Sequence, residues 1–246
     1  MKRYLHAFAM CQSMFCAIPV PCKIWDEEAR GKMLLFLPLV GLEIGGLWAA
    51  LAWLCGVLGL PLFVKALVLS LWPYLATGFL HLDGFMDVTD AVKSYRSLER
   101  RREILKDSRV GAFSVIGVVI LILSQFAFLA SAPETARWGI LMLVPAVSRC
   151  CSALAVTGLK PMATSQYADQ KKQSGHMIVL ALMLAVCLTG GFLVWGKYGL
   201  VLVGCVAGYG LALRKAYRSL EGMNGDISGY ALTLGELAAA AVFALI

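Results

Sequence analysis

The chain has 246 residues, of which 60% are hydrophobic and only 15% are charged, and its formal net charge is +7. This is too little charge to cover the surface of a soluble domain of that length, so the composition predicts an integral membrane protein and argues against a soluble helical one. Lipid-facing helices carry few charges, so the excess of Lys and Arg lies in loops, where the positive-inside rule explains it without a nucleic-acid partner.

The first predicted element covers residues 1–21 and resembles a signal peptide, because Lys2 and Arg3 precede an apolar stretch. Polar residues such as His6 interrupt that stretch, and it ends at Pro19-Val20-Pro21 without a small-residue cleavage site. We therefore expect a retained amphipathic or re-entrant helix at the membrane interface.

Seven apolar segments follow, and no linker divides them, so residues 1–246 are interpreted as one membrane-embedded domain. The predicted fold is all-α, a polytopic helical bundle of about seven transmembrane helices plus the N-terminal helix. A spanning helix needs roughly 20 residues, and the last two segments are short for that. The predicted spans are residues 33–56, 61–82, 111–132, 138–159, 177–195, 199–213 and 230–246.

The loops between these spans differ in charge. If residues 23–32 face the cytoplasm, alternation places 83–110, 160–176 and 214–229 on the same side, and these four segments hold most of the 22 basic residues. This bias supports both the topology and the number of spans. It predicts a multi-pass membrane protein whose basic loops face the cytoplasm.

Three aspartates gather where the second apolar segment ends, in GFLHLDGFMDVTDAVKS (78–94). Asp83, Asp87 and Asp90 have the spacing i, i+4 and i+7, which places them on one face of a helix. Unneutralised, three neighbouring carboxylates repel one another, and a divalent cation removes that repulsion. Their hard oxygen ligands suit Mg²⁺, with Mn²⁺ as the alternative. The competing interpretation is a solvated acidic helix end.

A basic block, residues 93–109, follows the aspartates directly. It would suit an amphipathic helix held on anionic lipid by its charge. The functional alternative is phosphate recognition, with Arg109 as the best candidate and Lys106 beside it, because arginine grips phosphate in a bidentate manner. Acidic residues with a nearby arginine are what a pyrophosphate–Mg²⁺ complex requires.

A Gly-rich turn before the last span, EGMNGD (221–226), supplies Asn224 and Asp226 as candidate substrate-binding residues. Its glycines let the backbone approach a ligand closely, and an ordinary turn is the alternative. Glu236 lies inside the last span, where a carboxylate is costly and is interpreted as functional.

Two further ionisable residues lie within predicted spans. Arg149 is a candidate substrate-binding residue. The default interpretation for the other one, Glu43, is a structural ion pair with Arg149. Gly41 and Gly45 form a small-residue face that favours close helix packing. His81 is a candidate base or metal ligand, with a hydrogen-bonded histidine at a helix end as the alternative.

These motifs together resemble the cobalamin synthase family, adenosylcobinamide-GDP ribazoletransferase. GFLHLDGFMDVTDAV is close to the family signature G-x-x-H-x-D-G-x-x-D-x-x-D. KDSRVGAF (106–113), AVSR (146–149) and GDISGYALTLGEL (225–237) follow in the family's order and spacing, and IPVP (18–21) matches its N-terminal landmark. The chain departs from the family at Cys16-Ala17, where many members carry Thr-Arg, and at Glu43.

The resemblance implies the reaction. A hydroxyl or phosphate of α-ribazole, or of its 5′-phosphate, attacks the cobinamide-linked phosphorus of adenosylcobinamide-GDP. GMP leaves, and adenosylcobalamin or its phosphate forms, with Mg²⁺ required. Asp83, Asp87 and Asp90 would then hold Mg²⁺, and Arg109 and Lys106 would bind the pyrophosphate. Asp226 would orient the incoming nucleotide or contribute a ligand, and a carboxylate or His81 would act as base.

Other functions compete with this one. A CDP-alcohol phosphotransferase would show an Ala-Arg pair after Asp-Gly, which is missing here, and a prenyltransferase would need a second aspartate-rich motif where residues 160–176 offer only Asp169. A cation-coupled transporter would place its acids near the bilayer midplane, often within repeated halves, and no repeat is evident. The expected partners are the two substrates and the lipid bilayer, with no nucleic acid and with homo-oligomerisation left open.

Overall fold

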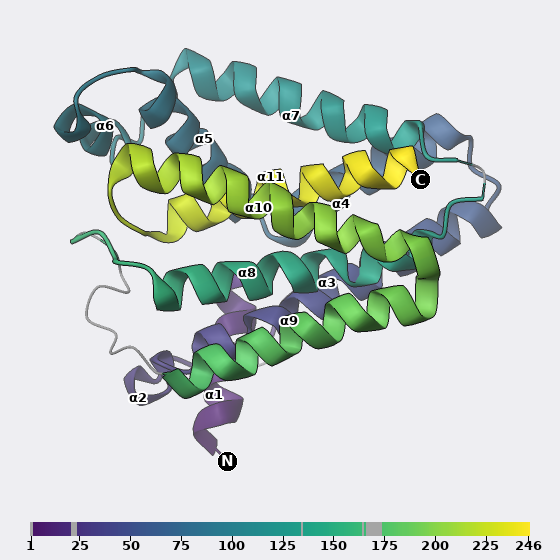
Figure 1. Cartoon of the computed structure of the whole chain (residues 1–246), viewed down its shortest axis with the longest axis horizontal. Helices are drawn as coiled ribbons and strands as arrows, with labels where there is room; N and C mark the ends of the chain where they lie inside the picture. Colours follow the sequence, from purple (N-terminus) through teal and green to yellow (C-terminus); the bar gives the residue numbers. More distant parts are fainter. Residues whose placement is uncertain (1, 21–23, 134, 164, 166–173) are drawn as a thin grey trace.

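The computed structural model describes residues 2–20, 24–133, 135–163, 165 and 174–246, and most of these residues are helical (Figure 1). Among them the only β pairing is one isolated bridge between Pro161 and Met223. The all-α prediction is therefore confirmed. The helices are α1 Lys2–Phe15, α2 Glu27–Arg30, α3 Met33–Val57, α4 Leu62–Ala76, α5 Leu80–Lys93, α6 Leu98–Ile104, α7 Ala112–Ala130, η1 Trp138–Met142, α8 Val144–Gly158, α9 Ser174–Trp195, η2 Gly196–Tyr198, α10 Gly199–Leu220 and α11 Gly225–Leu245.

Five helical stretches of the described residues are long and apolar enough to cross a membrane, or six if a bent pair counts as one span. The prediction was seven. The difference arises mainly at residues 175–220, a continuous 46-residue stretch that turns back at η2, so that α9 and α10 run antiparallel (Figure 1). Each arm has 22 residues, which is enough to span a bilayer.

The predicted span 61–82 is not one helix. Helix α4 ends at Ala76, and α5 begins at Leu80 after a bend of 87°. Gly78 and Phe79 both have positive φ, 56° and 64°, so the break is built into the backbone. Phe79 adopts this left-handed conformation at a cost that a glycine would avoid. The bend detaches the aspartate-bearing segment from the apolar helix before it.

The predicted N-terminal helix is present as α1, which packs along α3. His6 Nδ1 lies 2.7 Å from Asp26 Oδ2, and Asp26 also caps α2 by accepting from the main-chain N–H groups of Glu28 and Ala29. After α1 ends, the N–H of Ala17 donates to the carbonyl of Ala76, 2.8 Å away, at the end of α4. The segment that follows α1 is thereby held next to the α4–α5 break.

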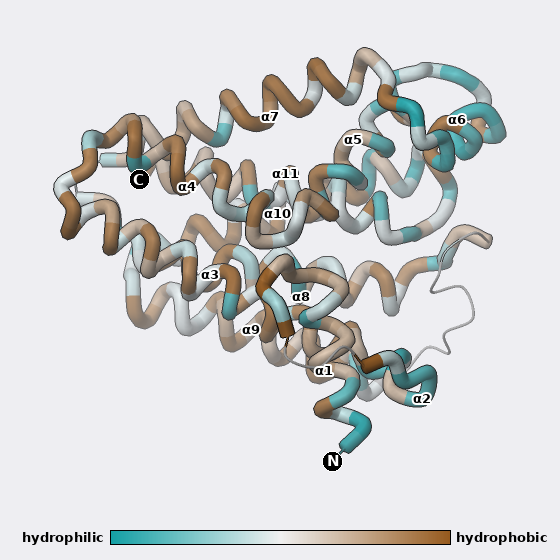
Figure 2. The backbone as a smooth tube through the Cα atoms, turned by 180° about the vertical axis from the view of Figure 1, so that it is seen from behind, coloured by the Kyte–Doolittle hydropathy of each residue, from teal (hydrophilic) through white to brown (hydrophobic). Residues whose placement is uncertain are grey.

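The helices divide into central and peripheral ones. Of the most apolar window in each, 78% is buried for residues 138–158 and 67% for α11, but only 22% for α7 and 11% for residues 175–220. The exposed side chains of α7 are apolar, among them Ile116, Val119 and Leu123. A helix that is apolar on its exposed side is suited to lipid rather than water. Figure 2 shows α7 and α9 as mainly hydrophobic, whereas hydrophilic residues gather around α5, α6 and α2.

Close packing between α3 and the η1–α8 segment confirms the prediction for the small-residue face. A Cβ added at Gly41 would lie 2.5 Å from the carbonyl oxygen of Pro145, and one added at Gly45 would lie 2.1 Å from that of Met142. Only glycine permits these approaches.

The predicted loops of one side do lie together. Figure 1 shows α2, the α5–α6 connection, the start of α7, the end of α8 and the α10–α11 turn at the same end of the molecule (left). We call this the polar end. Lys23, Asp169, Lys171 and Lys172, which entered the sequence argument, lie outside the described residues.

Candidate active site

Helix α5 is amphipathic, and its acidic face is the predicted one. Leu82, Phe85 and Val88 are buried, whereas Asp83 is exposed and Asp87 is half-buried. The charges of Asp83, Asp226 and Asp90 all act on the Asp87 carboxylate. The structure thus brings the three predicted aspartates together and adds a fourth, Asp226.

Asp90 has a structural task that the sequence did not reveal. The N–H of Gly111 donates to its Oδ2 at 2.8 Å, and the N–H of Ser114 donates to its Oδ1 at 2.9 Å. Amides at the start of a helix have no carbonyl acceptor within that helix, so Asp90 caps α7 and neutralises the positive end of its dipole. Its role as a metal ligand stays a prediction, and each carboxylate oxygen retains a lone pair.

Asp226 reaches the acidic face because α5 and α11 touch there. A Cβ added at Gly84 would lie 2.9 Å from the Cα of Asp226. Asn224 caps α11 by accepting from the N–H of Ile227 at 2.9 Å, and its side-chain amide donates to Asp226 Oδ2 at 2.7 Å. The predicted residue Asn224 therefore orients Asp226.

A cleft of about 290 Å³, the acidic cleft, joins the aspartates to the basic block. Asp83, Asp87 and Asp90 of α5 line it together with Lys106 and Arg109 from the segment between α6 and α7. Both predicted phosphate-binding residues thus share one cleft with the predicted metal-binding ones. The cleft combines carboxylates with cationic donors, which is the chemistry that a metal-bound pyrophosphate requires.

Arg109 is held by Asp107, a cleft residue that the sequence analysis did not single out. The Arg109 guanidinium donates from Nε to both carboxylate oxygens, at 3.0 and 3.1 Å, and from Nη2 to Oδ2 at 2.7 Å. This hydrogen bonding lowers the pKa of Asp107 to about 2, so the pair stays charged at neutral pH. The spacing Asp-x-Arg within KDSR was the signal that could have indicated it.

A second cleft, of about 590 Å³, lies on the other side of Lys106. Arg102, Asn224 and Asp226 line it together with Lys106, so Lys106 borders both clefts. Arg102 also anchors α6, because its guanidinium donates to the carbonyls of Leu220 and Glu221, each at 3.0 Å.

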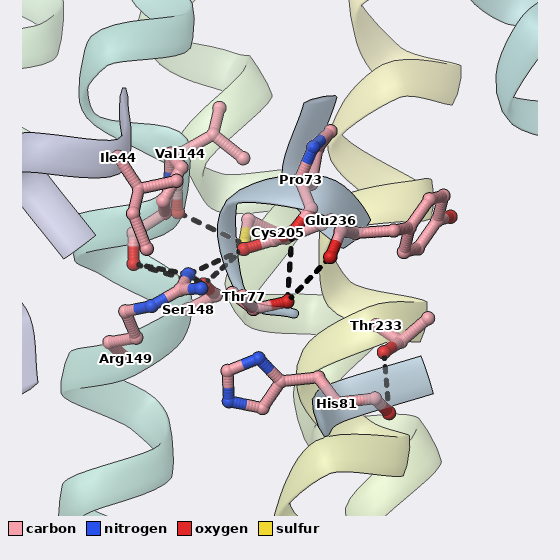
Figure 3. Close-up of polar contacts among 12 residues, drawn as sticks. Ile44, Pro73, Thr77, His81, Val144, Ser148, Arg149, Cys205, Thr233 and Glu236 are labelled. Atoms are coloured by element: carbon pink, nitrogen blue, oxygen red, sulfur yellow. Dashed lines mark hydrogen bonds and ion pairs between the residues drawn. The ribbon is translucent and has the colours of Figure 1, made fainter. Parts of the chain in front are cut away.

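His81 lies apart from the acidic cleft, although Asp83 is two residues away. Its ring is buried and lines a third cavity, which contains Asp226 as well. Its main-chain oxygen accepts from the hydroxyl of Thr233 on α11 at 3.3 Å, and Figure 3 shows the imidazole reaching toward α8 (pale teal).

Arg149 and Glu236 form a buried ion pair with each other (Figure 3). Arg149 Nη1 lies 2.8 Å from Glu236 Oε1, and Ser148 Oγ donates to the same oxygen at 2.8 Å. The interpretation that paired Arg149 with Glu43 is therefore wrong: α11, not α3, supplies the carboxylate. Neither member of the pair lines the three spaces described above, and substrate binding by either stays a prediction.

The donor set fits a hard divalent cation. Asp83, Asp87 and Asp90 line one cleft, and Asp226 lies near enough for its charge to act on Asp87, so their carboxylate oxygens are candidate ligands. Within the described ranges, no three His, Cys, Asp or Glu side chains already gather closely enough to hold a metal ion.

The comparisons with known proteins agree with the motifs. Residues 7–244 match the family model for cobalamin-5-phosphate synthase. Proteins named adenosylcobinamide-GDP ribazoletransferase are 36% identical in Clostridium perfringens, over 96% of both chains, and 34% identical in Geotalea daltonii, over 95% of this chain and 94% of the relative. Another from Lachnoclostridium phytofermentans is 33% identical over 96% of this chain and 92% of its own. No solved structure matches the chain significantly.

Proposed function

The chain belongs to the cobalamin-5-phosphate synthase family, and on that basis we propose that it is a membrane-embedded adenosylcobinamide-GDP ribazoletransferase, acting in nucleotide-loop assembly of cobalamin. One structural observation supports the assignment of the site: Asp226 of α11 packs against α5 and shares the second cleft with Lys106, which also lines the acidic cleft with Arg109 and the α5 aspartates.

The proposed reaction is a phosphoryl substitution. A hydroxyl of α-ribazole, or of its 5′-phosphate, forms a new P–O bond to the phosphorus that carries the cobinamide. The bond from that phosphorus to the bridging oxygen breaks, and GMP leaves with the electron pair. The hydroxyl proton passes to a carboxylate of the acidic face. Asp87 is the better candidate of the first two aspartates, because it is half-buried whereas Asp83 is exposed. Adenosylcobalamin or its 5′-phosphate is the product.

The cationic side chains bind and orient the pyrophosphate. Lys106 lies between the two clefts, so it can follow a substrate that extends from one to the other. Arg109 is fixed by Asp107 and presents its remaining donors to phosphate oxygens. These charges offset the negative charge that builds up on the leaving GMP.

A divalent cation, Mg²⁺ with Mn²⁺ as the alternative, would be held by Asp83, Asp87 and Asp226, with Asp90 next to them. When bound, it would neutralise the carboxylates and polarise the phosphoryl oxygens. We also propose that the polar end faces the cytoplasm across a bacterial inner membrane, as the positive-inside rule implies.

The function is tested with purified protein in detergent. Given adenosylcobinamide-GDP, α-ribazole and Mg²⁺, it should release GMP, and EDTA should stop the release until Mg²⁺ or Mn²⁺ is restored. Folded protein that releases no GMP would overturn the assignment. GMP release that EDTA does not affect would overturn only the proposed requirement for a divalent cation.

A further inference from the structure

A third cavity, of about 230 Å³, opens beneath the end of α1. Four other elements complete it, namely α3, the start of α5, α8 and the first turn of α11. Asp226 lines both this cavity and the second cleft, so one molecule could occupy the cavity and still reach the phosphate-binding region. We call it the α1 cavity.

The walls of the α1 cavity are apolar and include an aromatic ring. Leu34 and Leu37 of α3 and Val156 of α8 contribute aliphatic surface. The Phe15 ring lies nearly parallel to the imidazole of His81, with an interplanar angle of 8° and 6.5 Å between ring centroids. Flat parallel rings and aliphatic walls favour a planar aromatic ligand.

The cavity also holds a polar group without a partner. His81 is 9% exposed, and its Nδ1 has no hydrogen-bond partner within the described part of the chain. A buried polar nitrogen without a partner is unfavourable, so a ligand that pairs with it is favoured. A neutral imidazole has one donor and one acceptor, so a ring nitrogen or a hydroxyl of a ligand can satisfy it. Ser152 and Ser228, whose hydroxyls contact each other, add polarity on the side of α8 and α11.

We infer that the α1 cavity binds the benzimidazole base of the acceptor nucleoside. This inference rests on the proposed function, which supplies two candidate bases. Guanine carries a carbonyl and an amino group that need several hydrogen-bond partners. The Ser152 and Ser228 hydroxyls already pair with each other, and Asp226 Oδ2 already accepts from the Asn224 amide. Dimethylbenzimidazole has methyl groups and a single free ring nitrogen, which match the aliphatic walls and the unpartnered Nδ1 of His81. Asp226, at the junction with the second cleft, then faces the ribose hydroxyls.

The test is to narrow the cavity and measure each substrate separately. Val156→Phe adds bulk at a half-buried position of the wall, and Val119→Phe is the matched control on the exposed side of α7. We expect the KM for α-ribazole to rise about tenfold in Val156→Phe, with the KM for adenosylcobinamide-GDP within twofold of wild type. The control should change neither constant.

A second variant guards against misfolding of the first. Phe15→Leu removes the ring but keeps an apolar side chain, and it should raise the KM for α-ribazole with little change in kcat. A rise in the KM for adenosylcobinamide-GDP instead would put guanine in the cavity and overturn the inference, as would unchanged constants in both variants.

Direct binding separates this inference from the proposed function. Equilibrium dialysis of α-ribazole against the wild-type protein and both variants needs no turnover. Binding weakened by Val156→Phe but not by Val119→Phe supports the inference even if no GMP is released. Normal GMP release with α-ribazole binding unaffected by either cavity variant refutes it and leaves the proposed function intact.

Discussion

Aspartates that look equivalent in the sequence have different surroundings in the structure. The Asp90 carboxylate accepts hydrogen bonds from two main-chain N–H groups at the start of α7, whereas no main-chain N–H of the described residues donates to Asp87. The spacing i, i+4 and i+7 could predict the shared face. It could not predict the cap, because the donors Gly111 and Ser114 lie more than 20 residues later in the chain.

We therefore expect Asp87→Asn and Asp90→Asn to fail for different reasons. Asp87→Asn should lower kcat by about 100-fold at unchanged thermal stability, because it removes a charged ligand or base. Asp90→Asn keeps one acceptor oxygen and loses the charge at the α7 N-terminus, so it should lower the free energy of unfolding by about 1 kcal/mol. Thermal unfolding in detergent and GMP release measure the two effects. Equal stability of both variants would contradict the capping role.

The buried Arg149–Glu236 pair permits a prediction about stability. Glu236→Leu should destabilise the protein by about 3–5 kcal/mol, because it leaves the Arg149 guanidinium buried without its carboxylate. The double variant Arg149→Met with Glu236→Leu should recover much of that loss, since an apolar pair needs no charge compensation. Thermal unfolding checks both variants. If the double variant were as unstable as the single one, packing around these residues would matter more than their charges.

At the level of elements, the site depends on how α5 meets α11. Sequence periodicity identified both segments, but it joined α5 to α4 as one span, because the run from Leu62 to Leu82 is apolar with a single glycine near its end. The hydrogen bond from the Ala17 N–H to the Ala76 carbonyl, at the end of α4, joins residues 59 positions apart in the chain. Such contacts leave no local pattern that a sequence could show.

The contact between α5 and α11 is tested by Gly84→Ala. Its Cβ would lie 2.9 Å from the Asp226 Cα and 3.0 Å from the Asp226 carbonyl oxygen, both main-chain atoms that cannot swing aside. We expect Asp226 to be displaced from the acidic face and kcat to fall by about tenfold or more. Gly46→Ala makes the same change within helix α3, where a Cβ meets nothing within 4 Å, and should leave activity unchanged. Wild-type activity in Gly84→Ala would remove Asp226 from the proposed site.

For the whole molecule, composition predicted the all-α helical bundle, and loop charge predicted which loops lie on the same side. The basic residues between α5 and α7, such as Arg96, Lys106 and Arg109, do lie at one end, and α7 carries an apolar exposed surface. Which helices occupy the centre was not predictable, since α8 and α11 are no more apolar than α7. Their burial follows from polar partners on other helices, such as Glu236 with Arg149 and Ser148.

The orientation of this arrangement is the remaining prediction, and it concerns every loop at once. Arg96 lies at the polar end between α5 and α6, and Ser131 follows α7 at the opposite end; both are exposed. The described cysteines are buried or half-buried, so single Arg96→Cys and Ser131→Cys variants in a Cys22→Ser background carry one accessible thiol each. If the polar end faces the cytoplasm, a membrane-impermeant maleimide added to spheroplasts labels Ser131→Cys directly. It labels Arg96→Cys only after the membrane is opened. The reverse pattern would place the acidic cleft outside the cell, away from cytoplasmic nucleotides, and the proposed reaction would then lack its substrate.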